Sequence, residues 1–68
     1  MNYQNLCEKI IQFVGGKDNI QNVVHCVTRL RFTLRDQSIA DIDELLELKE
    51  VIDVIANEVV FQVVIGPQ

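Results

Sequence analysis

The chain has 68 residues, of which 49% are hydrophobic, and a net charge of −4. This length allows one small domain with a modest core, and the acidic balance argues against a general nucleic-acid-binding protein. No segment approaches the roughly 20 apolar residues that cross a bilayer. Polar residues follow Met1 without a signal-peptide pattern, so we expect two free thiols and a cytoplasmic location.

The first predicted element is an amphipathic helix over residues 3–14. Its apolar residues recur at three- and four-residue spacing: Leu6, Cys7, Ile10, Ile11 and Val14. This places Cys7 on the buried face, where we expect a purely structural role. Gly15 and Gly16 follow, and glycine at this position supplies the left-handed turn that ends many helices.

Two strands, over residues 20–27 and 29–35, form a predicted antiparallel hairpin. The first is rich in β-branched residues, whereas the second alternates strictly. Leu30, Phe32 and Leu34 share one face, and the other face carries Arg29, Arg31, Thr33 and Arg35. The second strand is therefore half-buried with a wet, basic face, and residues 26–28 lie at or beside the turn.

A second unit of helix and hairpin follows the break at residues 36–38. Asp41 caps the helix, with Glu44 three residues on as in a capping box. The predicted buried face of this helix consists of Ile42, Leu45, Leu46 and Leu48. Strands over residues 51–56 and 59–65 then turn near Asn57-Glu58. The order α-β-β-α-β-β predicts an α+β domain with helices on one face of an antiparallel four-stranded sheet.

The basic and acidic residues are separated along the chain, and one cysteine lies in the basic part. Eight of the ten acidic residues lie in residues 36–58, whereas three of the six basic residues lie in residues 29–35. Positive charge beside Cys26 favours its thiolate, which is the nucleophile. The planar fork of arginine binds phosphate through two bonds, and Thr28 with the turn N–H groups can complete an anion site.

Simpler interpretations of the same residues remain open at this point. Cysteine is among the most buried residue types, and basic residues along a strand are usually a solvated face. His25 alone indicates a half-exposed strand histidine. One histidine and two cysteines do not give the spacing of a zinc site.

Four motifs carry a family resemblance that extends over nearly the whole chain. They are FVGGKDNI (13–20), HCVTRLRFTLRD (25–36), LLELKEV (45–51) and FQVVIGP (61–67). With these motifs the sequence resembles the enzyme IIB (EIIB) domain of the bacterial phosphoenolpyruvate-dependent sugar phosphotransferase system, in its glucose/β-glucoside/sucrose family. The core C-x-T-R-L-R is highly specific for that family.

The resemblance implies a protein-cysteine phosphotransferase that uses no cofactor and no metal. Cys26 corresponds to the phosphorylated cysteine, and Thr28, Arg29 and Arg31 correspond to the phosphate-binding residues. The phosphoryl group would come from a phosphohistidine on an enzyme IIA partner and pass to a sugar held by the membrane permease IIC. The location implied is the cytoplasm, or the cytoplasmic face of the inner membrane through the permease.

The resemblance also implies a single EIIB-type domain over residues 1–68 that lacks the C-terminal helix of the family. We expect two short helices to leave apolar side chains near the last hairpin uncovered, which favours self-association or an unstable monomer. One alternative is a non-catalytic regulatory or protein-binding module of the same fold. A nucleic-acid-binding sheet of the RNP type is disfavoured by the acidic charge and the few aromatic residues.

Overall fold

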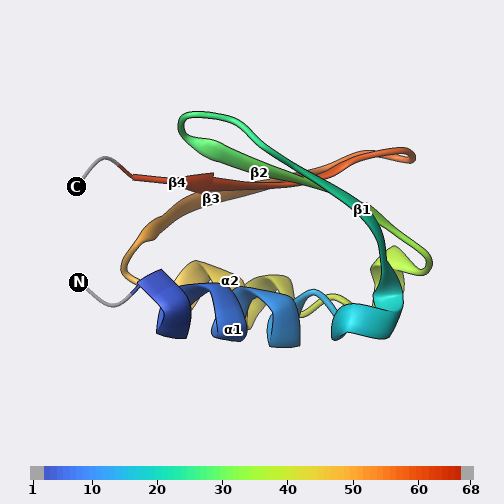
Figure 1. Cartoon of the computed structure of the whole chain (residues 1–68), viewed down its shortest axis with the longest axis horizontal. Helices are drawn as coiled ribbons and strands as arrows, with labels where there is room; N and C mark the ends of the chain where they lie inside the picture. Colours follow the sequence, from blue (N-terminus) through green and yellow to red (C-terminus); the bar gives the residue numbers. More distant parts are fainter. Residues whose placement is uncertain (1–2, 67–68) are drawn as a thin grey trace.

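Two helices lie on one face of a four-stranded antiparallel sheet in the computed structural model, which describes residues 3–66 (Figure 1). The elements are α1 (Tyr3–Phe13), β1 (Ile20–His25), β2 (Arg29–Leu34), α2 (Ile42–Glu47), β3 (Val51–Ala56) and β4 (Phe61–Ile65), with 3-10 turns at Lys17–Asn19 and Gln37–Ile39. The predicted fold class and element order are confirmed. The predicted lack of a C-terminal helix concerns chain beyond the described residues.

The sheet has the order β1-β2-β4-β3, so β2 and β4 are its central strands. Phe32 pairs with Phe61 and Leu30 with Val63, which brings the apolar faces of the two central strands together under the helices. The buried core consists of Leu6, Ile10, Val14, Phe32, Leu34, Leu45, Val51, Phe61 and Val63. Since β1 is an edge strand, its side chains are mostly exposed.

The connection from α1 to β1 depends on two glycines and a buried asparagine. Gly15 and Gly16 have φ values of 112° and 89°, which confirms the predicted left-handed helix end. The Nδ2 group of Asn19 donates to the carbonyl oxygens of Val14 (2.8 Å) and Asp36 (2.9 Å). Its Oδ1 accepts from the backbone N–H of Asp36 at 2.9 Å. Asn19 thereby joins the end of α1 to the residue that follows β2.

The second helix is shorter than its apolar pattern suggested. Oδ1 of Asp41 accepts from the backbone N–H of Glu44 at 3.1 Å, which confirms the predicted N-cap. Leu45 is fully buried, but Ile42 and Leu46 are 40% and 46% exposed. The prediction that these two residues are buried is wrong, because a six-residue helix turns only one narrow stripe toward the core.

Both hairpin turns contain more residues than predicted, because one strand beside each turn is shorter than expected. The strand expected over residues 20–27 ends at His25, and the strand expected over residues 59–65 begins at Phe61. Oδ1 of Asn57 accepts from the backbone N–H groups of Val59 and Val60, at 2.9 and 2.8 Å. This asparagine therefore organises the second turn through its side chain and removes residues 57–60 from the strands.

Candidate phosphate-binding site

The turn between β1 and β2 holds Cys26 in a defined backbone conformation. The backbone N–H of Cys26 donates to the carbonyl oxygen of Arg29 at 2.8 Å, and the carbonyl of Thr28 accepts from the N–H of Ile65 at 2.7 Å. The thiol of Cys26 is free and half-buried. Within residues 3–66, the backbone N–H groups of Val27 and Thr28 have no hydrogen-bond partner. Two donors next to the thiol therefore remain available to an anion.

Two arginines emerge next to this turn on the face of the sheet that no helix covers. Phe32 is buried and Leu30 packs against the core, so Arg29 and Arg31 project from the opposite side of β2. Arg31 is exposed, whereas Arg29 is half-buried, and its Nη1 group donates to Oε1 of Gln62 at 3.0 Å. Among the described residues, neither guanidinium forms an ion pair with a carboxylate. Both positive charges are therefore available to phosphate.

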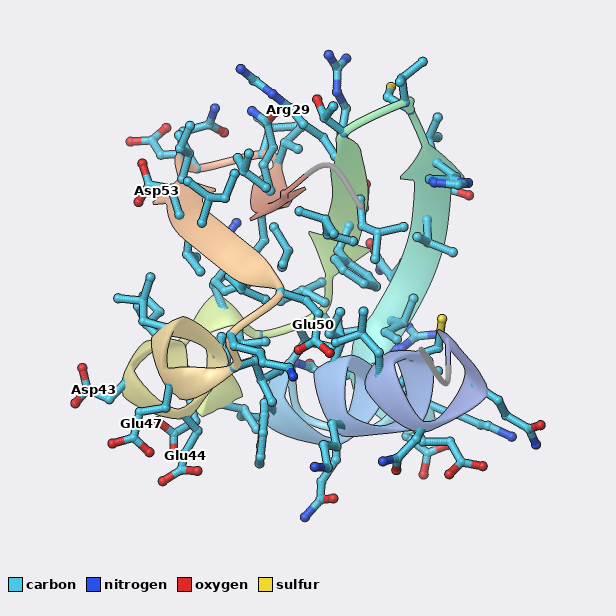
Figure 2. All side chains as sticks on the ribbon, turned by 90° about the vertical axis from the view of Figure 1, so that its left-hand side faces the viewer. Arg29, Asp43, Glu44, Glu47, Glu50 and Asp53 are labelled. Carbon is cyan, nitrogen blue, oxygen red and sulfur yellow. The ribbon has the colours of Figure 1, made fainter. Side chains whose placement is uncertain are left out.

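The separation of charge along the sequence persists in part in space, although Asp53 lies on the same side of the sheet as Arg29 (Figure 2). Figure 2 shows Arg29 on the helix-free side of the sheet, while Asp43, Glu44 and Glu47 project from α2 on the other side and away from the sheet. The acidic side chains of α2 therefore do not compete for the arginines.

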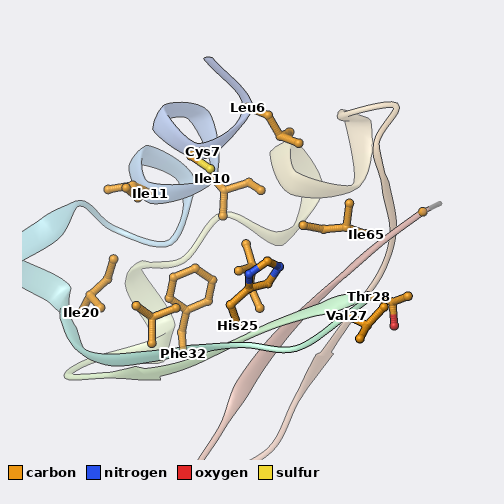
Figure 3. Close-up of a pocket in the computed structure, with 13 residues that line it drawn as sticks. Leu6, Cys7, Ile10, Ile11, Ile20, His25, Val27, Thr28, Phe32 and Ile65 are labelled. Carbon is orange, nitrogen blue, oxygen red and sulfur yellow. The ribbon is translucent and has the colours of Figure 1, made fainter. Parts of the chain in front are cut away.

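The structure brings the predicted site residues together in one hairpin. Cys26 and Thr28 occupy the turn, Arg29 begins β2, and Arg31 follows on the same face. His25, the last residue of β1, is exposed and instead points to the helix side (Figure 3). Gln62 is the neighbour that the sequence reasoning missed. Gln62 lies between the buried residues Phe61 and Val63, so strand alternation places its side chain on the opposite face. Once β2 is known to pair with β4, this is the face that carries the arginines.

The prediction that Cys7 is buried is wrong. The residue is exposed, and it lines an apolar groove of about 690 Å³ between α1 and the helix-facing side of the first hairpin. Figure 3 shows Cys7 above this groove and the imidazole of His25 pointing into it. Uncovered apolar surface was expected near the last hairpin. Ile52 and Val59 are indeed exposed there, but the groove itself lies at the first hairpin, because α1 leaves the inner side of β1 open.

The part of the chain that the structure describes has neither a metal-ligating cluster nor a helix that could span a membrane. Residues 3–66 contain no group of three or more metal-ligating side chains. Over the same residues, no helix has the length and apolar character needed to cross a bilayer.

A family model described as phosphotransferase system, EIIB matches residues 8–41. The chain is 47% identical over 66 residues, 97% of its length, to the β-glucoside-specific EIIBCA component of Halalkalibacterium halodurans. It is 44% identical over 62 residues, 91% of its length, to the N-acetylmuramic acid-specific EIIBC component of Pasteurella multocida. The chain belongs to the EIIB family of the phosphotransferase system.

A solved structure shows the same fold. One domain of the phosphotransferase system IIabc component from Clostridium difficile superposes with a TM-score of 0.86 at 30% sequence identity. The match covers 94% of this chain and 66% of that one. The chain spans only 10% of the Halalkalibacterium halodurans protein and 13% of the Pasteurella multocida protein. These relatives are therefore much longer than this chain.

Proposed function

We propose that the chain is a phosphocarrier domain in which Cys26 accepts a phosphoryl group from phosphorylated enzyme IIA and passes it to a sugar. In the first step the sulfur attacks phosphorus, the P–N bond of the IIA phosphohistidine breaks and an S–P bond forms. The thiol loses one proton in this step, and the released imidazole nitrogen takes one up, so the protons balance. In the second step a sugar hydroxyl displaces the sulfur, and its proton returns to the thiolate.

One observation carries this proposal: a free cysteine lies in a turn with two unpaired N–H groups, next to arginines that no carboxylate neutralises. Phosphoryl transfer depends mainly on positioning and on charge stabilisation. The N–H groups of Val27 and Thr28, with the Thr28 hydroxyl, serve as donors to phosphate oxygens. Arg29 and Arg31 supply the positive charge, so the site needs no metal.

The names of the relatives support a IIA protein and a IIC permease as the partners in this phosphoryl transfer. They are EIIBCA or EIIBC components, in which an EIIB region accompanies C and, in some, A regions. We propose that this domain acts with a IIA protein or domain and a IIC permease, at the cytoplasmic face of the membrane. The relatives are named for different sugars, namely β-glucosides, N-acetylmuramic acid and sucrose. Sugar choice accordingly belongs to the permease.

The proposal is tested by phosphoryl exchange with a phosphorylated IIA protein of the β-glucoside branch. The unmodified chain should take up phosphate and return it when excess unphosphorylated IIA is added. Cys26→Ser should lose both reactions, while the matched variant Cys7→Ser keeps them. A Cys26→Ser variant that exchanges phosphate normally would contradict the proposal. A chain that binds phosphorylated IIA without taking phosphate would favour the non-catalytic module.

A further inference from the structure

The side chain of Gln62 links the two central strands on the helix-free face. Gln62 lies opposite Arg31 in the β2–β4 register, and opposite Ile55 in the β3–β4 register. Its Oε1 nevertheless accepts from Nη1 of Arg29, whose own partner in the register is Val64. The contact is therefore diagonal across the strand pair. It holds the guanidinium of Arg29, a half-buried residue, against β4 and toward Arg31.

The chemistry of this contact differs from that of an ion pair. A carboxylate would orient an arginine but also cancel the charge that a phosphate needs. The amide oxygen of Gln62 orients Arg29 and leaves its full positive charge in place. Asp53 is the acidic residue opposite Val64 on β3, and its Oδ1 accepts from the backbone N–H of Val54 at 2.8 Å. Among the described residues, it forms no ion pair with Arg29.

We propose that Gln62 is a positioning residue, which acts on phosphoryl transfer by fixing the guanidinium of Arg29 on the arginine-bearing face of the sheet. This inference rests on the proposed function and adds a residue to it. A long arginine side chain loses considerable rotamer freedom when it is fixed. A scaffold that fixes it before phosphate arrives avoids that cost at the moment of transfer. Gln62 is well suited to this task, because it projects from a central strand whose neighbouring residues Phe61 and Val63 are fully buried.

The first readout tests the contact without reference to activity. In ¹⁵N-resolved NMR spectra of the unmodified chain, the guanidinium signals of Arg29 should show restricted exchange and rotation. Gln62→Met keeps the length of the side chain and removes the acceptor, so it should abolish this signature. Gln62→Glu should retain it. Gln21→Met changes an exposed glutamine on the edge strand and serves as the matched control. An Arg29 signal that is the same in Gln62→Met as in the unmodified chain would overturn the proposal.

The second readout is the rate of phosphoryl exchange between Cys26 and IIA. Gln62→Met should slow exchange about tenfold, since a hydrogen bond to a charged group is lost. Gln62→Glu should also be slow although it orients Arg29, because its carboxylate neutralises the guanidinium. In an Arg29→Gln background, Gln62→Met should cause no further loss. The Gln21→Met control should exchange at the normal rate.

The outcomes separate this inference from the proposed function. Normal exchange in Gln62→Met, or an equal loss with and without Arg29, would overturn the positioning role while the phosphocarrier function stands. If the unmodified chain takes up no phosphate at all, the proposed function fails. In that case the NMR comparison alone decides whether Gln62 fixes Arg29. Circular dichroism and thermal melting of each variant identify any that fail to fold.

Discussion

The backbone N–H of Cys26 donates to the carbonyl oxygen of Arg29 at 2.8 Å, so the thiol and the first arginine of the site belong to one closed turn. This bond fixes the backbone positions of both residues relative to each other. Val27, between them, is 97% exposed. The turn therefore stands out from the sheet, where a partner protein can reach it. The reactivity of Cys26 and the role of the arginines follow from this placement.

The reactivity of the two thiols provides the first prediction. Both can be reached by reagents, because Cys7 is exposed and Cys26 half-buried, so burial alone does not distinguish them. The arginines should attract an anionic reagent to Cys26. We expect the rate of alkylation by iodoacetate relative to iodoacetamide to be higher at Cys26 than at Cys7. Mass spectrometry of the two cysteine peptides over time measures this ratio.

A control separates the charge of the arginines from general accessibility. Arg31→Gln should lower the ratio at Cys26 and leave that at Cys7 unchanged, and high salt should act in the same direction. Equal ratios at the two cysteines would mean that the arginines do not attract anions to Cys26.

The second prediction distinguishes bidentate phosphate binding from simple attraction. Arg31 is exposed, so Arg31→Lys should fold normally. If the guanidinium grips phosphate with two bonds, lysine should slow transfer from Cys26 to sugar, with a deficit of about 1–3 kcal/mol. Transfer is measured against ionic strength in vesicles that contain a IIC permease.

The matched control for this substitution is Arg35→Lys. Arg35 follows the far end of β2, and its Nε donates to the carbonyl oxygen of Asp18 at 3.0 Å. We expect this variant to transfer phosphate at the normal rate. Full activity of Arg31→Lys at every salt concentration would show that the basic face of β2 is only a solvated surface and does not bind phosphate through two bonds.

The third prediction concerns stability at the end of α1. Alanine at Gly15 or Gly16 must adopt a positive φ, which costs about 1–3 kcal/mol at either position. At Gly15 the added Cβ would also lie 2.6 Å from Nδ2 of Asn19, whereas at Gly16 it meets nothing within 4 Å. Gly15→Ala should therefore be clearly less stable than Gly16→Ala in urea unfolding. Equal losses of stability in the two variants would show that the side chain of Asn19 moves aside without a cost in free energy.

The fourth prediction is a pH dependence at Asp36. The hydroxyl of Ser38, and then its backbone N–H, donate to the carboxylate and lower the pKa of Asp36 below its usual value of 3.8. Because the pKa is lower in the folded chain, this stabilisation is present above that value and is lost as the pH falls through the lowered pKa. Ser38→Ala should raise the pKa of Asp36, as followed by its ¹³C carboxyl shift. An unchanged titration would contradict this assignment.

Features that depend on neighbouring residues in the sequence were predicted correctly. The alternation in residues 29–35 defined both faces of β2, and the two glycines marked the end of α1. The position of Cys26 in a turn followed from two adjacent strands. Each of these inferences uses only the period of a strand or the conformational freedom of glycine.

Several features that depend on how elements pack together were not predicted correctly, although the layer arrangement was. Cys7 fits the apolar period of α1, yet the helix turns that residue toward an open groove. Ile42 and Leu46 are exposed because α2 covers little of the sheet. The bond between Arg29 and Gln62 joins residues 33 positions apart, and it requires the β2–β4 pairing, which no local pattern specifies.

The most direct test of the phosphocarrier function is to locate the phosphate on the unmodified chain. After incubation with a phosphorylated IIA protein, the chain is digested under conditions that preserve phosphocysteine, and its two cysteine peptides are analysed by mass spectrometry. We predict one phosphoryl group, on Cys26, and none on the exposed Cys7. Phosphate on Cys7, or on neither cysteine, would contradict the assignment of this turn as the site of phosphoryl transfer.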